Sequence, residues 1–262
     1  MTDSTLQFYQ FPYMSDNYGV LVHDAVSGET ACVDAGDADA ALQALQHTGW
    51  TLTQIWITHH HADHTAGLSA LKQATNAAVT GPDASLNPAT PIVGIDRFVN
   101  EGDSFVFGAN EADTVAVLHT PGHTLDMVNY SLPAAGVYFA GDTLFTMGCG
   151  KLFEGTPEMM WTSLNKIMTL PPATVVYCSH EYTVENGEFA VQVEPDNTAL
   201  QQRMEQSISR RADGLPTVPS TLAEELATNP FLRASDQHLR DTLGLASASD
   251  LEVFTEVRKR RG

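Results

Sequence analysis

The sequence predicts an α/β domain that is followed, near residue 180, by a smaller domain built of helices. Up to residue 180, short apolar runs alternate with turn clusters and helical patterns, whereas beyond it we expect helices and no strands. The chain has 262 residues, 43% of them hydrophobic, which is enough for one substantial core and an appended unit. We therefore expect two domains, 1–180 and 181–262.

Individual elements follow from local patterns. Strands are expected where apolar runs lie between turn residues: 18–22, 30–33, 54–57, 104–107, 115–118, 127–132, 137–140 and 175–178. Helices are expected where apolar residues recur at helical spacing: 37–46, 66–75, 157–168, 195–212, 221–227, 235–243 and 249–261. The spacings of Thr221 to Glu224 and of Ser249 to Glu252 are those of capping boxes, which predicts the starts of two of these helices.

Composition restricts the partners of the chain. Its 13 basic and 32 acidic residues give a formal net charge of -19, which repels nucleic-acid phosphates. Cys32, Cys149 and Cys178 contain no CxxC pair, so a reducing cytosol is favoured over a disulfide framework or a structural zinc knot. The sequence contains no secretory leader pattern and no apolar run of membrane-spanning length. We expect a cytoplasmic monomer that binds neither nucleic acid nor membranes.

Residues 58–64 read Thr-His-His-His-Ala-Asp-His and are rich in potential metal ligands. Alternate side chains of an extended segment point the same way, so His59 and His61 can hold one ion together, while Asp63 and His64 can serve a neighbouring ion. His60 alternates away and is expected to pack or to form a hydrogen bond. Imidazole and carboxylate without thiolate suit zinc, iron(II) or manganese(II). Taken alone, the segment is also compatible with a solvated turn or a weak, non-catalytic metal patch.

Further ligand-type residues occur in later turns at strand ends: His123 in His-Thr-Pro-Gly-His-Thr, Asp142 in Gly-Asp-Thr, and His180 in Cys-Ser-His-Glu-Tyr. Loops at strand ends are where rigid scaffolds present chemistry. Singly, such an Asp is usually a turn former and such a His a satisfied polar residue. Their joint occurrence favours a metal centre. Asp34 could orient a ligating imidazole, and a turn-forming role explains it about as well.

Taken together, these motifs resemble the metallo-β-lactamase superfamily, whose THxHxDH, TPGHT-type His, GD Asp and late His appear here in order. More narrowly the chain is similar to the glyoxalase II (hydroxyacylglutathione hydrolase) family, through THHHADHTAG, GDTLF, GCGKLFEGT and YCSHEYT. The likeness continues through EPDN at 194–197 and NPFLR at 229–233, and so covers nearly the whole chain. It implies an αββα sandwich of two mixed β-sheets flanked by helices, with a C-terminal all-helical domain that binds substrate.

The resemblance also implies roles for individual residues. His59, His61 and His123 would bind the first metal, and Asp63, His64 and His180 the second. Asp142 would bridge both ions, and with Asp63 it would act through a hydroxide held between the metals. The implied cofactor is two divalent metal ions, zinc first, with iron or manganese as alternatives.

The glutathione part of the substrate would be held, by the same resemblance, by Lys151, Tyr182, Arg258 and Arg261. Phe153 stands where many relatives have Tyr, which removes a hydroxyl donor. Arg258 and Arg261 are three apart on one helix and can share a face, so they could hold a carboxylate. Cations at a helix C-terminus also stabilise the helix by complementing its dipole, which is the alternative reading of both.

The implied reaction is hydrolysis of S-(2-hydroxyacyl)glutathione thioesters, typically S-D-lactoylglutathione to D-lactate and glutathione, the second step of methylglyoxal detoxification. Two ions ~3.5–4 Å apart can activate a shared water and polarise the carbonyl. A thiolate leaves readily, because the pKa of its conjugate acid is about 8.5. The alternatives are a persulfide dioxygenase with one iron, a general thioesterase of the same fold, and a non-catalytic metal-binding relative.

Overall fold

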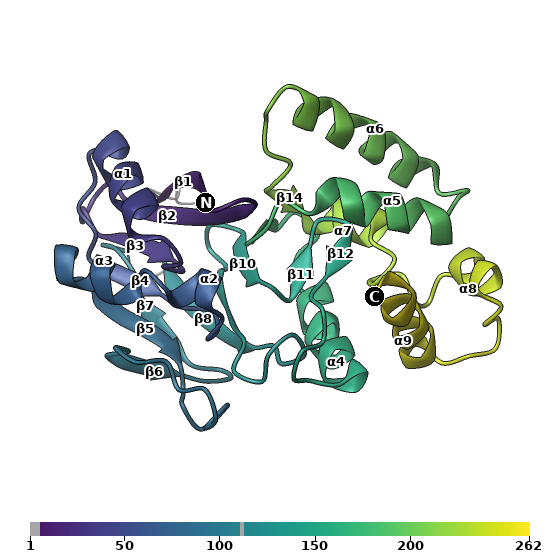
Figure 1. The fold of residues 1–262 in the computed structure, drawn as a ribbon, viewed down its shortest axis with the longest axis horizontal. Helices are drawn as coiled ribbons and strands as arrows, with labels where there is room; N and C mark the ends of the chain where they lie inside the picture. Colours follow the sequence, from purple (N-terminus) through teal and green to yellow (C-terminus); the bar gives the residue numbers. More distant parts are fainter. Residues whose placement is uncertain (1–5, 111–112) are drawn as a thin grey trace. The chain divides into compact units, whose positions relative to one another are not determined.

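The structure is a computed structural model that describes residues 6–110 and 113–262 (Figure 1). These residues form two compact units. Unit 1 takes the described residues of Met1–His119 and Thr124–Gly141, and unit 2 takes Thr120–His123 and Asp142–Gly262. The division into units rests on compactness, so the boundary at residue 180 that the sequence suggests between two functional domains stays a prediction. No helix of the described residues is long and apolar enough to cross a membrane.

The first sheet of unit 1 consists of strands in chain order: β1 (Leu6–Tyr13), β2 (Asn17–Asp24), β3 (Thr30–Val33), β4 (Gln54–Trp56), β5 (Ala78–Pro82) and β6 (Arg97–Val99). The pairs β1/β2 and β2/β3 are antiparallel, whereas the strands from β3 to β6 run parallel. The parallel part brings the carboxyl ends of β3 and β4 to the same edge of the sheet. Asp34 directly follows β3 and the histidine tract follows β4 at that edge.

Helices α1 (Ala38–Thr48), α2 (Ala62–Thr65) and α3 (Leu68–Thr75) connect the parallel strands. Helix α1 begins where the Asp37 side chain accepts a hydrogen bond from the Ala40 amide, and it ends at Gly49 in the left-handed conformation. The sheet register aligns Cys32, Ile55 and Val79 in one row, and all three belong to the core that also contains the buried leucines and alanines of α1 and α3. One face of the sheet is thus covered by helices.

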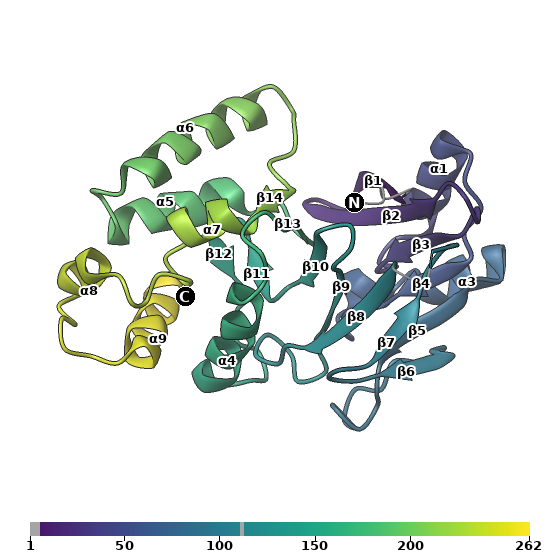
Figure 2. The same ribbon diagram turned by 180° about the vertical axis from the view of Figure 1, so that it is seen from behind.

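Trp56 lies on the opposite face of this first sheet and is fully buried. Its ring lies 5.1–6.4 Å, centroid to centroid, from those of Phe105, Phe107, Tyr130 and Phe139. Three of these partners belong to the antiparallel strands of the second sheet, and Phe107 directly follows β7: β7 (Ser104–Val106), β8 (Thr114–His119), β9 (Val128–Leu132) and β10 (Val137–Gly141). Figure 2 shows these strands from behind. The two sheets therefore pack face to face around an aromatic core.

Unit 2 contains two short antiparallel pairs and most of the helices. The pairs are β11 (Leu144–Phe145) with β12 (Gly148–Cys149), and β13 (Val175–Cys178) with β14 (Ser220–Thr221). The helices are α4 (Pro157–Met168), α5 (Thr183–Val193), α6 (Thr198–Ala212), α7 (Leu222–Thr228), α8 (Gln237–Leu243) and α9 (Asp250–Arg261). One core joins Met147 to residues of α5 and α6, and Trp161 of α4 packs on Phe254 of α9 at 5.5 Å.

Most of the predicted elements are present, and both capping boxes, at Thr221 and Ser249, are formed. The expectation that strands stop at His180 is wrong, because β14 pairs with β13 through Ser220 and Thr221. Strands β1, β5, β6, β11 and β12 and helices α2 and α5 were not predicted. Helix α5 buries one face, but that face includes Thr183, Asn186 and Gly187, so the sequence shows neither a clear apolar stripe nor a strong intrinsic helix propensity.

Candidate metal centre

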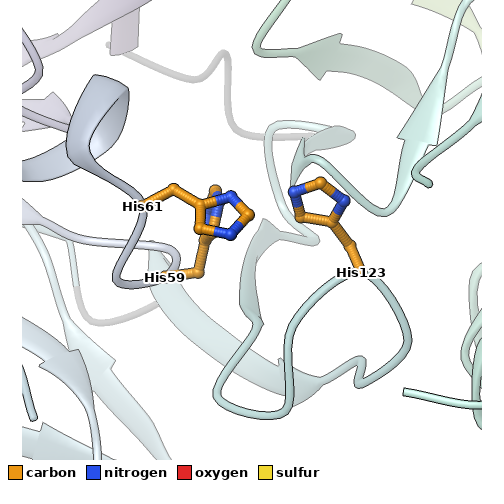
Figure 3. A group of neighbouring side chains, drawn as sticks. All are labelled: His59, His61 and His123. Carbon is orange, nitrogen blue, oxygen red and sulfur yellow. The ribbon is translucent and has the colours of Figure 1, made fainter. Parts of the chain in front are cut away.

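The histidine tract lies in unit 1, on the loop between β4 and α2. The His59 and His64 side chains are buried, and the centroid of the His59 ring lies 4.7 Å from that of His61 and 4.1 Å from that of His64. Figure 3 shows His59 and His61 extending from the chain segment that leads into α2. His61 is itself the N-cap residue of α2, so the start of this short helix determines the direction in which the segment leaves the sheet. The tract is therefore a cluster of imidazoles and not a solvated turn.

Asp34 connects this cluster to the end of β3. Its carboxylate accepts hydrogen bonds from the backbone amide of Thr58 at 2.8 Å and from the Thr58 hydroxyl, and it lies 2.7 Å from Nδ1 of His64. Contact with a carboxylate places the imidazole proton on Nδ1, so Nε2 carries the lone pair that a metal would use. Of the two roles that the sequence left open for Asp34, the structure supports the orienting one.

Asp63 is held in place by two side chains of the β1–β2 hairpin. Asn17 donates to its carboxylate at 3.0 Å, and the Tyr13 hydroxyl donates to its backbone carbonyl at 2.9 Å. The same carboxylate oxygen of Asp63, Oδ2, lies 3.3 Å from Nε2 of His64. Sequence reasoning missed both supporting residues, because neither belongs to a pattern and the Asn17 contact spans 46 positions of the chain.

Unit 2 contains the other three predicted ligands, each just beyond a strand. His123, Asp142 and His180 follow β8, β10 and β13 and are all buried. One carboxylate oxygen of Asp142, Oδ2, lies 3.3 Å from Nε2 of His123 and 3.4 Å from Nε2 of His180. An acceptor flanked by two imidazole nitrogens is the arrangement expected of a carboxylate that serves two ions.

The ring of His123 is oriented by the segment that follows β12. Its Nδ1 lies 2.8 Å from the carbonyl oxygen of Lys151, and because a carbonyl oxygen only accepts, Nδ1 carries the proton. Its Nε2, the nitrogen beside Asp142, then carries the lone pair that a metal ion would use. His60, by contrast, has its Nδ1 2.9 Å from Asp126 Oδ1, the hydrogen-bonding role predicted for it.

The chemistry of these donors suits a divalent cation. The described residues include groups of His and Asp side chains able to hold metal ions. The three thiols are buried, and burial raises the pKa of Cys149 to about 11 and that of Cys178 to about 12. Imidazole and carboxylate ligands without thiolate fit zinc, iron(II) or manganese(II).

The predicted substrate-binding residues all belong to unit 2. Phe153 is 62% exposed and its ring meets the His123 ring edge to face at 5.2 Å, while Tyr182 stacks on His180 at 4.7 Å. The Lys151 ammonium is exposed and lies 6.0 Å from the centre of the Phe153 ring. Arg261 donates to the Asn186 side chain over 3.4 Å, whereas Arg258 is buried. Two aromatic rings of the set thus contact predicted metal ligands directly.

Comparisons with known proteins identify the family of the chain. A family model described as "Hydroxyacylglutathione hydrolase C-terminus" matches residues 181–262, and one for the "Metallo-beta-lactamase superfamily" matches residues 19–180. Hydroxyacylglutathione hydrolase of Chelativorans sp. (strain BNC1) is 48% identical over 257 residues, covering 98% of both chains. The protein of that name in Brucella ovis is 49% identical over 259 residues, covering 99% of this chain and 98% of its own.

Solved structures agree with the fold. ETHE1 from Myxococcus xanthus has a TM-score of 0.66 and 26% identity, over 97% of this chain and 90% of that one. TTHA1623 in a di-iron-bound form has a TM-score of 0.60 over 85% of this chain and 98% of that one, and its 23% identity shows likeness of fold alone. The predicted metallo-β-lactamase fold with a C-terminal helical region is confirmed. The chain therefore belongs to the hydroxyacylglutathione hydrolase family of the metallo-β-lactamase superfamily.

Proposed function

We propose that this chain hydrolyses S-(2-hydroxyacyl)glutathione thioesters, typically S-D-lactoylglutathione, to a hydroxy acid and glutathione. The observation that carries the proposal is the match to relatives named hydroxyacylglutathione hydrolase, at 48–49% identity over nearly the whole chain. The match of residues 181–262 to the C-terminal model of that family favours this activity over a one-iron dioxygenase or a general thioesterase. We propose accordingly that 1–180 is the catalytic domain and 181–262 the substrate-binding domain.

For the metal centre we propose the ligand assignment suggested by the sequence. One ion takes His59, His61 and His123, the other takes Asp63, His64 and His180, and Asp142 serves both. The position of Asp142 Oδ2 between two imidazole nitrogens supports this assignment. Zinc is our first choice, because imidazole nitrogen and carboxylate oxygen donors suit it, and iron or manganese fit the same donors.

When bound, two divalent cations supply Lewis acidity that lowers the pKa of water and polarises the thioester carbonyl. The chain itself supplies orientation. Asp34 and the Lys151 carbonyl hold protons on the Nδ1 atoms of His64 and His123, which keeps each Nε2 in its metal-binding form. The leaving thiolate of glutathione needs little protonation, so no strong general acid is required.

The glutathione moiety is the part of the substrate that we assign to unit 2. Its carboxylates are complementary to Lys151 and Arg261, cations in a chain with a net charge of -19. Tyr182 offers a hydroxyl beside His180, and Phe153 offers an aromatic face beside His123. Arg258 is the fifth member of the proposed set, and its guanidinium already donates to three backbone carbonyl oxygens.

We further propose a cytosolic monomer as the working form. Three buried free thiols fit a reducing compartment. Size-exclusion chromatography with light scattering would test the monomer, because a dimer has twice the mass of a 28.3 kDa chain.

The assay that tests the proposed function compares two substrates on the metal-loaded enzyme. One is S-D-lactoylglutathione, and the other is a simple acyl thioester without the glutathione part. We expect kcat/KM to favour the glutathione thioester strongly. Comparable cleavage of both would point to a general thioesterase, and no cleavage of either with metal bound would reject hydrolysis.

A further inference from the structure

Arg258, in the last turns of α9, is a buried cation whose contacts are internal to unit 2. It is 9% exposed, and its Nη1 donates to the carbonyl oxygens of Cys149 at 2.9 Å and Gly150 at 3.5 Å. Its Nη2 donates to the carbonyl oxygen of Gly262 at 3.1 Å, and the guanidinium lies 5.1 Å from the centre of the Phe231 ring. Burying a cation is costly unless it is hydrogen-bonded in this way, so the contacts mark a specific role.

The segment that Arg258 holds, residues 149–151, packs directly on two predicted metal ligands. A Cβ atom added at Gly150 would lie 2.0 Å from the backbone oxygen of Asp142 and 3.1 Å from Cβ of His123. The Gly150 amide donates to the Thr143 carbonyl at 3.2 Å, which closes the turn against the chain after Asp142. Because there is no space for a side chain here, a small movement of the segment would displace both ligands.

The same segment also determines the orientation of the His123 ring. The Lys151 carbonyl, one residue beyond Gly150, is the acceptor for Nδ1 of His123. A second bond, from the Phe153 amide to the His123 carbonyl at 3.2 Å, ties the two stretches of backbone together. A short and continuous path of contacts therefore leads from Arg258 through Gly150 and Lys151 to a metal ligand.

We infer that Arg258 is a positioning residue, which couples the C-terminal helix to the metal centre by holding the carbonyls of Cys149 and Gly150. This inference rests on the proposed function, in which His123 binds a metal. It gives Arg258 a role beyond membership of the proposed glutathione-binding set: Arg258 orients the segment that carries Lys151, whereas for Arg261 we propose substrate contact alone. Arginine suits the task, because its rigid guanidinium lets Nη1 donate to the carbonyls of Cys149 and Gly150 while Nη2 donates to that of Gly262, which the compact, strongly hydrated ammonium of lysine does less well.

The test measures zinc affinity by competition with a chromophoric chelator, together with melting temperature and steady-state kinetics. The matched control is Phe254→Leu, also on α9, where Phe254 packs on Trp161 and has a fully buried side chain. We expect Arg258→Ala to weaken zinc binding by about 10-fold, the lower end of the range for partners that orient metal ligands. Arg258→Lys should recover part of this affinity, and Phe254→Leu should lower the melting temperature while leaving zinc affinity unchanged.

Kinetics separate positioning from substrate contact. Arg258→Ala should lower kcat at saturating zinc, whereas Arg261→Ala should raise KM and leave zinc affinity unchanged. Wild-type zinc affinity in Arg258→Ala with only KM raised would overturn the inference, and so would an equal loss of affinity in Phe254→Leu. If Arg258→Ala does not fold, the zinc affinity and kcat of Arg258→Lys test the inference instead. His123→Gln separately tests the assumption that His123 binds a metal, because unchanged zinc affinity in that variant would reject the proposed ligand set.

Discussion

The Nδ1 atom of His64 lies 2.7 Å from Oδ2 of Asp34, although the two residues are 30 positions apart in the chain. Asp34 has a φ of 61°, a left-handed conformation that Asp and Asn tolerate better than most residues. Its carboxylate also anchors the Thr58 amide, so one side chain orients a predicted ligand and holds the start of the histidine tract.

Replacing Asp34 with Asn tests this relationship, since Asn keeps the backbone tolerance and removes the charge. We expect zinc affinity to fall by about 10- to 100-fold, as for other partners that orient metal-binding histidines. The matched control is Asp126→Asn, which alters the contact with His60, a residue outside our proposed ligand set, and should leave the zinc affinity of that set unchanged. An equal effect of the two substitutions would show that Asp34 acts only through general stability.

Asp142→Ala removes the carboxylate that we assign to both ions. The protein should bind less than its full complement of metal, and kcat/KM should fall by more than about 100-fold, because the metals contribute several kcal/mol of transition-state stabilisation. Metal content by plasma emission spectrometry and the thioester assay check this together. A fully metallated and active Asp142→Ala enzyme would exclude the assignment.

Phe153→Tyr should improve glutathione binding by supplying a hydroxyl donor at an exposed position. A single hydrogen bond contributes about 0.5–1.5 kcal/mol net, so we expect KM for S-D-lactoylglutathione to fall about 2- to 10-fold with kcat nearly constant. Kinetics with a thioester that lacks glutathione provide the control and should not change. An unchanged KM for the glutathione thioester would argue against a contact between this position and the glutathione part.

The three thiols should be unreactive in the folded protein. Burial raises the pKa of Cys149 to about 11 and of Cys178 to about 12, and it raises that of Cys32 as well, so little thiolate exists near neutral pH. Labelling with a disulfide reagent at pH 8 should therefore be slow in the native state and complete for all three in denaturant. Rapid native labelling of one thiol would contradict its burial and its raised pKa.

Local signals explain which elements the sequence could predict. Helix α4 has the predicted bounds because Thr156 caps it and Pro157 occupies its first turn, and both are visible in the sequence. Helix α5 depends on tertiary packing instead: a Cβ at Gly187 would lie 2.4 Å from the sulfur of Met204, so glycine is required there despite its poor helix propensity. Strand β1 contains Pro12 and lacks clean alternation, and its pairing with β2 stabilises it.

In the candidate site, too, local motifs could be predicted from the sequence and long-range contacts could not. Its seven ligand-type residues were predictable because they lie in short motifs at strand ends. The residues that hold these ligands in place were not predictable. Asn17 contacts Asp63 across 46 residues and Arg258 contacts Cys149 across 109 residues, and no local sequence pattern indicates such contacts. The sequence also suggested a substrate contact for Arg258, and only the fold reveals its internal carbonyl partners.

Titration of the metal-free enzyme with zinc is the decisive experiment for thioester hydrolysis at a centre of two metal ions. Hydrolysis of S-D-lactoylglutathione would be measured after each addition, alongside the zinc bound per chain. We predict that kcat reaches its maximum only as the second equivalent binds. Full activity at one equivalent would exclude a requirement for two ions, and no activity at two would exclude this hydrolysis.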